Sequence, residues 1–120
     1  MEDLLKEYEL NRKINRFLFN SLEMKTSTIG MCYWINAISY CINNQVKDKQ
    51  YMPIIREIYR YIADKHNTSV DCVEKAMRYA KETSHYKVYF NIENTLKNTD
   101  FLLLCLDRIV SQIAVEMVDK

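Results

Sequence analysis

The segment from Ile58 to Ala80 reads IYRYIADKHNTSVDCVEKAMRYA and predicts two helices joined by a short polar turn. Apolar residues recur every three or four positions on both sides of that turn, as Ile55, Ile58, Tyr59 and Ile62 before it and as Val70, Val73, Ala76, Met77 and Ala80 after it. This spacing is typical of helices that bury one face. Pro53 suits the opening turn of the first helix, which should end near Lys65, and Thr68 and Ser69 supply hydroxyls that can cap the second. The arrangement is that of a helix-turn-helix.

The rest of the chain also favours helices. One glycine and one proline in 120 residues are too few for the hairpin turns of a many-stranded sheet. Further helices are expected from Asp3 to Leu22, with one break near Leu10 or Asn11, from Gly30 to Asn43, and from Phe101 to about Val118. Residues 84–98 are expected to be irregular with some helix. We predict an all-α fold of about five or six helices, in a single domain of residues 1–120.

Composition excludes several classes of protein. Hydrophobic residues make up 48% of the chain and charged residues 28%, which is typical neither of a disordered chain nor of a membrane protein. The longest apolar run, residues 101–106, is too short to span a bilayer, and the first residues lack the order of a signal peptide. We therefore expect a soluble cytoplasmic protein. The net charge of +1 gives no global attraction to nucleic acid, so any attraction must come from a local patch.

The sequence carries no recognisable catalytic, cofactor or metal site. The four cysteines form no C-x-x-C pair, and each is expected to pack as a reduced thiol among apolar neighbours: Cys32, Cys41, Cys72 and Cys105. His66 falls in the turn and His85 follows the second helix, and neither has a cysteine or carboxylate placed as a clear partner. Glycine-rich phosphate loops are absent. We expect no enzymatic activity, no cofactor, no metal and no small-molecule substrate.

The second helix of the pair has a polar face opposite its apolar stripe. That face is expected to hold Asp71, Glu74, Lys75, Arg78, Lys81 and Glu82. A helix that a rigid turn projects from the rest of the domain can bring long side chains to the base edges of DNA. Lys75 and Arg78 are well placed for this. An ordinary helical corner with a solvated face has the same pattern. From the pattern alone, both interpretations stay open.

The same region resembles a known family. The pattern I-A-x-K-x-N-T-x-x-x-x-V-E-x-A-x-R, from Ile62 to Arg78, combines turn residues, core spacing and surface residues. Together with Gly30–Ser39 upstream and Asn98–Phe101 downstream, it resembles the C-terminal DNA-binding effector domain of the sporulation master response regulator. The resemblance covers roughly residues 22–109. It divides the chain into an N-terminal helical extension (1–22), an effector-like domain (23–109) and an extension of the last helix (110–120).

The resemblance implies a domain that binds double-stranded promoter DNA in the major groove, as a homodimer or in tandem copies, and controls endospore formation. By position, three residues match members of the family's DNA-reading helix: Glu74, Lys75 and Arg78. We add Ser69 at the start of that helix and, as phosphate contacts, Lys65, Lys81 and Lys87. The family's effector normally follows a receiver domain, for which these 120 residues leave no room, so phosphorelay control through this chain is not expected.

Two departures from the family pattern leave a second hypothesis open. Cys72 stands where the family has an arginine, and Asp71 adds a negative charge at a neutral position, and both changes disfavour the approach of phosphates. The first hypothesis, which follows from the resemblance, is that the chain is a stand-alone DNA-binding transcriptional regulator. The alternative is a protein-interaction module that kept the fold, lost DNA binding, and acts through partner proteins or dimerisation. The apolar faces of the two extensions would cover the core, which we favour, or form a dimer.

Overall fold

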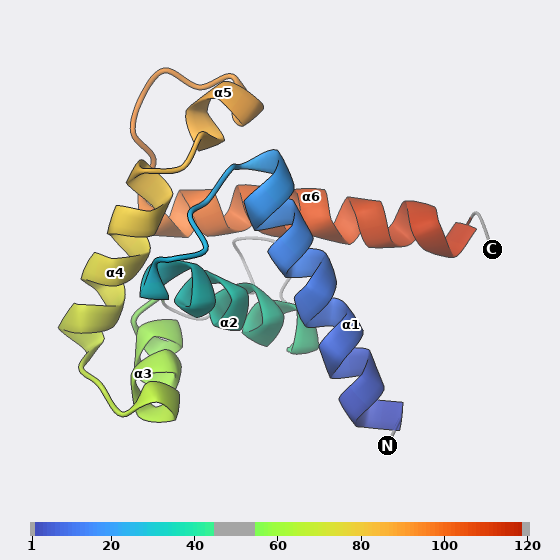
Figure 1. The fold of residues 1–120 in the computed structure, drawn as a ribbon, viewed down its shortest axis with the longest axis horizontal. Helices are drawn as coiled ribbons and strands as arrows, with labels where there is room; N and C mark the ends of the chain where they lie inside the picture. Colours follow the sequence, from blue (N-terminus) through green and yellow to red (C-terminus); the bar gives the residue numbers. More distant parts are fainter. Residues whose placement is uncertain (1, 45–54, 119–120) are drawn as a thin grey trace.

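The computed structural model describes residues 2–44 and 55–118, and within these ranges it consists of helices and their connections, without strands. In chain order the elements are α1 (Glu2–Arg16), the π-helix η1 (Phe17–Ser21), α2 (Ile29–Asn43), α3 (Ile55–His66), α4 (Val70–Glu82), α5 (Tyr86–Phe90) and α6 (Asn98–Val118). Figure 1 shows α1, α3, α4 and α6 around α2, with α5 apart from it beyond the end of α4. The predicted all-α class is confirmed, and so is the mixture of loop and short helix predicted for residues 84–98. The expected role of Pro53 lies outside the described residues.

The core is organised by α2, which packs against α1, α3, α4 and α6. Its Trp34 is fully buried and packs edge-on against Phe101 of α6, with 4.7 Å between ring centroids. The indole Nε1 of Trp34 donates a hydrogen bond of 2.7 Å to the backbone oxygen of Met77 in α4. One side chain therefore links three helices and satisfies its own polar atom in the interior.

Gly30 allows α2 and α4 to come into close contact. A Cβ atom at this position would overlap the backbone oxygen of Ala76 and would lie 2.7 Å from the Cβ of Ala80. Any side chain at residue 30 would therefore push α2 away from α4. The glycine is required by this approach of two helices and not by an unusual backbone conformation.

The N-terminal helix differs from the expectation in where it changes. The predicted break near Leu10 or Asn11 is wrong, because α1 continues to Arg16. The winding then widens into η1, where the backbone N–H of Leu22 donates to the oxygen of Phe17, 3.3 Å away and five residues earlier. Phe17 and Leu18 are both buried within this wider turn.

The two ends of the chain cover the core only in part. Ile14, Phe17 and Leu18 are buried, but Leu5 and Tyr8 in the first half of α1 are 58% and 63% exposed, and Phe19 of η1 is 50% exposed. In α6, Ile113 packs against the core, whereas Val115 is 60% exposed. Among the described side chains, the expectation that both extensions pack on the core is therefore wrong at Leu5, Tyr8 and Val115. Figure 1 shows the outer ends of α1 and α6 extending past the neighbouring helices.

Two of the four cysteines are buried and two are exposed. Cys41 and Cys105 are buried, as expected, and burial raises the pKa of the Cys41 thiol to about 12. Cys32 and Cys72 are exposed, which corrects the prediction that all four pack among apolar neighbours. Both lie on helix faces that point away from the core. Within the described ranges, none of the helices has the length and apolar character needed to cross a membrane.

Candidate nucleic-acid interface

A tight corner joins α3 to α4. Asn67 adopts a left-handed conformation (φ 54°), and the N–H of Thr68 donates to the oxygen of Ala63 over 2.9 Å, which closes α3 with a Schellman-type turn. Ser69 then caps α4, because its hydroxyl oxygen accepts a hydrogen bond of 3.1 Å from the N–H of Cys72. The predicted helix-turn-helix and its serine cap are confirmed. Both helix ends at the corner are satisfied locally, so the direction of α4 is well defined.

The exposed face of α4 carries mixed charges. Val73, Met77 and Ala80 are buried against the core. The face that points away from the core consists of Asp71, Cys72, Lys75, Arg78, Tyr79 and Glu82. Two cations thus share the face with two carboxylates, with Glu74 half-buried at its edge. The α4 surface is therefore not a basic patch in itself.

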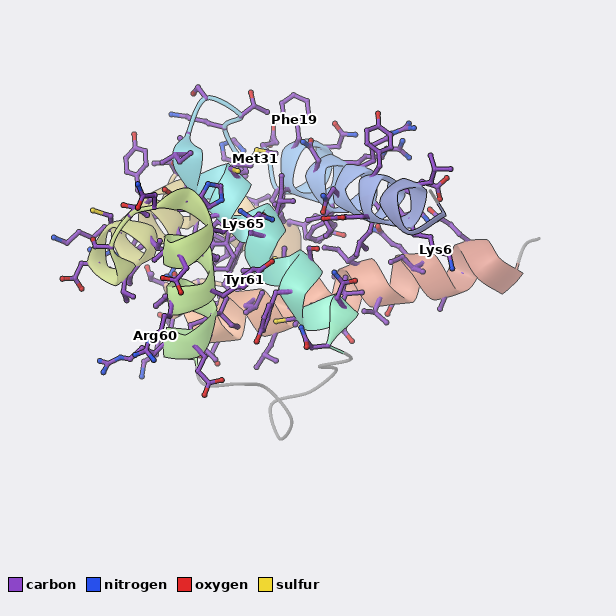
Figure 2. All side chains as sticks on the ribbon, turned by 90° about the horizontal axis from the view of Figure 1, so that it is seen from below. Lys6, Phe19, Met31, Arg60, Tyr61 and Lys65 are labelled. Carbon is purple, nitrogen blue, oxygen red and sulfur yellow. The ribbon has the colours of Figure 1, made fainter. Side chains whose placement is uncertain are left out.

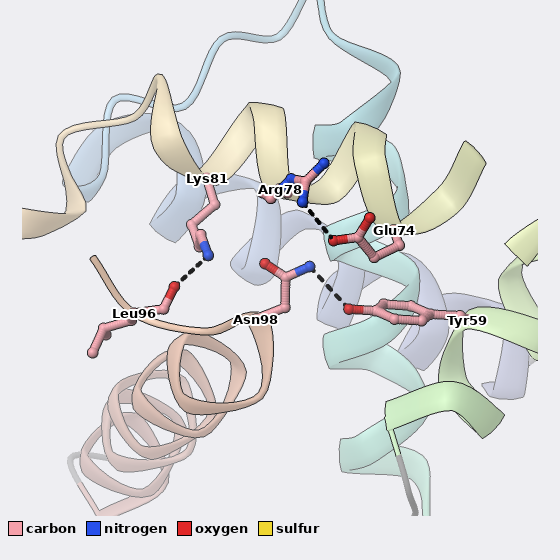
Figure 3. Close-up of polar contacts among 6 residues, drawn as sticks. All are labelled: Tyr59, Glu74, Arg78, Lys81, Leu96 and Asn98. Carbon is pink, nitrogen blue, oxygen red and sulfur yellow. Dashed lines mark hydrogen bonds and ion pairs between the residues drawn. The ribbon is translucent and has the colours of Figure 1, made fainter. Parts of the chain in front are cut away.

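Glu74 and Arg78 form an ion pair one helical turn apart. The Arg78 guanidinium lies 3.5 Å from a carboxylate oxygen of Glu74 (Figure 3), and the two side chains are 49% and 33% exposed. A glutamate four residues before its partner has the favourable orientation in a helix, yet such an exposed pair contributes only about 0.3–0.5 kcal/mol. A phosphate or a guanine edge can therefore displace Glu74 from Arg78 at little cost.

Lys81 is buried, which corrects its predicted place on the polar face. Its side chain is 2% exposed, and its ammonium donates a hydrogen bond to the backbone oxygen of Leu96, in the loop before α6 (Figure 3). Burial lowers the pKa of Lys81. The loop folds over the end of α4 and covers Lys81. The helical periodicity of α4 could not predict this burial, because the covering residues lie elsewhere in the chain.

The two other lysines expected at phosphates lie beyond opposite ends of α4. Lys65 is exposed at the end of α3, where its ammonium is 3.4 Å from the side-chain oxygen of Asn36. Figure 2 shows Lys65 overlapping the ribbon of α2, with which it makes this contact. Lys87, in α5, is half-buried and donates a hydrogen bond of 2.9 Å to the Thr95 hydroxyl. Since α4 has 13 residues, about 20 Å of helix separates these two positions.

Sequence reasoning missed two features beside α4. Tyr79 is 57% exposed on the same face as Arg78, and the signal was available, because Tyr79 follows Lys75 by one turn and lies off the apolar stripe. Asn98 is buried and donates a hydrogen bond of 2.9 Å to the hydroxyl of Tyr59 (Figure 3), whose pKa is raised by burial. No local sequence pattern predicts the hydrogen bond between Asn98 and Tyr59, because the two residues are 39 positions apart.

The two histidines have partners from distant segments. Nε2 of His66 lies 2.6 Å from the side-chain nitrogen of Asn36. Nδ1 of His85 lies 2.6 Å from a carboxylate oxygen of Glu23, which corrects the expectation that His85 has no carboxylate partner. The His85–Glu23 pair is about 60% exposed on both sides. In the part of the chain that is described, no three potential metal ligands come together.

The corner, the capped α4 and its exposed face place the chain in the class of helix-turn-helix domains. A family model described as the sporulation initiation factor Spo0A C terminal matches residues 15–108, and the chain belongs to this family. The family is a DNA-binding effector domain of a sporulation regulator and not a family of enzymes, which confirms the resemblance seen in the sequence. Comparison with curated proteins and with solved structures gave no match.

Proposed function

We propose that the chain binds double-stranded DNA in a sequence-specific manner, with α4 in the major groove, and acts as a transcriptional regulator of sporulation. The observation that carries the proposal is the capped α4, which projects Lys75 and Arg78 away from the core at a rigid corner. An α-helix fits the major groove, and arginine and lysine are the side chains that most often read guanine there. Glu74 would accept a hydrogen bond from a cytosine amino group once Arg78 turns to the DNA.

The flanking cations supply the phosphate contacts in this proposal. Lys65 lies just before the corner and Lys87 beyond the other end of α4, so they would meet the backbone on either side of the groove, with Ser69 at the start of the helix. Lys81 is left out, because its ammonium is buried against Leu96. Tandem copies on adjacent sites or a homodimer would add to the small footprint of one domain.

The proposal is tested by fluorescence anisotropy with a duplex that carries the sporulation regulator's recognition box and with a scrambled duplex, over a salt series. The expected result is a preference for the box that weakens as salt increases. The double variant Lys75→Ala and Arg78→Ala should lose roughly 30-fold or more in affinity, since each base contact contributes about 1–3 kcal/mol. The control, Lys6→Ala and Lys25→Ala, removes the same charge outside α4 and should change affinity little. Undiminished binding by the α4 variant would refute α4 as the reader.

A second candidate function is supported by the charges on α4. Asp71 and Glu82, with Glu74 at the edge, outnumber Lys75 and Arg78, and carboxylates repel the DNA backbone. This observation favours a protein-interaction module that kept the family fold without DNA binding. Absence of binding to either duplex at low salt is the result expected of such a module.

A further inference from the structure

A groove runs between the N-terminal helical segment and α2, on the side of α2 away from α4. It has a volume of about 670 Å³. The proposal uses six of the residues that line the groove. One helical stripe of α1 and η1 and the facing turn of α2 provide them, namely Tyr8, Arg12, Arg16 and Phe19 on the first side and Ile35 and Asn36 on the second. We propose that this groove docks an acidic, amphipathic segment of a protein partner. The proposal concerns a surface separate from α4 and does not depend on DNA binding.

Charge is the first argument. Arg12 and Arg16 lie one turn apart on the stripe and are both exposed, and no aspartate or glutamate is among the residues that line the groove. Two guanidinium groups at this spacing can each hold a carboxylate through paired hydrogen bonds. An occupant with acidic residues one helical turn apart would match them.

Apolar side chains in the groove favour a ligand that has apolar groups as well as charges. Tyr8 and Phe19, 63% and 50% exposed, stand on the α1–η1 side, and half-buried Ile35 lies on α2. Figure 2 shows Phe19 projecting outward from the end of this helical segment. Phe19 belongs to the π-helix η1, and interruptions of this kind are frequent at functional sites. Arginine and aromatic residues together are typical of the centres of protein interfaces, so the occupant should offer apolar side chains beside its carboxylates.

The position of the groove favours a protein over DNA. α2 packs against both α1 and α4, so it lies between the groove and the proposed DNA-reading helix (Figure 1). A partner in the groove would leave the exposed face of α4 free. It would still reach Asn36, whose side chain contacts the ammonium of Lys65 and the ring of His66 at the corner before α4. A docked segment would therefore touch the residue that holds Lys65.

The test measures anisotropy of a fluorescein-labelled peptide of about four helical turns, with leucines at helical spacing and glutamates between them, against the full chain. Saturable binding is expected at low salt, and a peptide with lysine in place of glutamate should not bind. The double variant Arg12→Gln and Arg16→Gln should weaken binding roughly tenfold, and Phe19→Ala roughly fivefold. The control, Lys6→Gln and Lys97→Gln, removes equal charge elsewhere and should change affinity less than about twofold. Circular dichroism verifies that each variant keeps its helices.

Three results would overturn the proposal. The first is no saturable binding of the glutamate peptide, and the second is equal loss in the groove variant and the control. The third is a loss of duplex DNA affinity in the arginine variant as large as its loss of peptide affinity, which would assign the groove to nucleic acid. Because the peptide assay contains no DNA, its failure is distinguishable from failure of DNA binding by α4.

Discussion

Replacing Gly30 with alanine tests how closely α2 and α4 pack. The added Cβ would overlap the Ala76 backbone oxygen and would lie 2.7 Å from the Ala80 Cβ, where ordinary contact begins near 3.4 Å. A backbone oxygen within a helix cannot swing aside, so α2 must retreat and loosen its packing around Trp34. Overpacking of this kind costs about 1–3 kcal/mol, and the backbone clash places Gly30→Ala at the upper end. The helix preference of alanine over glycine offsets at most about 1 kcal/mol.

The expected net loss in the free energy of unfolding is therefore about 2 kcal/mol, with a fall in Tm of roughly 6–10 °C for a domain of this size. Urea titration and thermal melts followed by circular dichroism measure both. Ser39→Ala, on the same helix, is the matched control and should change stability by less than about 0.5 kcal/mol. Ala80→Gly alone should cost about 1 kcal/mol in helix preference. Measured in that background, Gly30→Ala should cost less than it does alone but still destabilise, because the contact with the Ala80 Cβ is gone and the overlap with the backbone oxygen of Ala76 remains.

A neutral or stabilising Gly30→Ala would refute this reasoning, because helix preference would then exceed the clash. The same result would mean that α2 and α4 are farther apart than the structure places them. No cost of Gly30→Ala in the Ala80→Gly background would instead assign the clash to Ala80 rather than to the backbone of α4.

Further predictions concern single side chains on or near α4. Trp34→Phe removes the buried hydrogen bond to the oxygen of Met77 and should cost about 1–2 kcal/mol of unfolding free energy in urea titration. Ser69→Ala removes the α4 cap and should cost about 1 kcal/mol, whereas Ser69→Asp should retain most of it. Glu74→Gln frees Arg78 and removes a repulsive charge while keeping a side-chain oxygen that can accept from the cytosine amino group, so duplex affinity at low salt should rise severalfold, and an unchanged affinity would argue against α4 at the DNA. Burial lowers the pKa of Lys81 in the folded state, so the unfolded chain binds more protons than the folded chain as pH approaches 10.5. The free energy of unfolding therefore gains a term that increases with pH in this range. Lys81→Met should lack this increase when unfolding of the two proteins is measured over the same pH series.

Local patterns in the sequence were sufficient for most of the helices and for the corner. Periodic apolar residues located α3 and α4, and the hydroxyl of Ser69 located the start of α4, because capping and amphipathic spacing involve residues three or four positions apart. The turn pattern from Ile62 to Arg78 also carried the family resemblance, which the family match confirmed. For the proposed interface, the exposed positions of Lys75 and Arg78 followed from the same periodicity.

What the tertiary structure alone decided involves residues far apart in the chain. Lys81 has the charge and helical position of a surface residue, yet the loop at Leu96 covers it. His85 gained a carboxylate partner 62 residues away. The groove beside Arg12 exists only because α2 lies against the N-terminal segment. Helix-forming patterns act over one or two turns, whereas burial and pairing depend on which elements meet after the chain has folded, and that choice leaves no mark in local spacing.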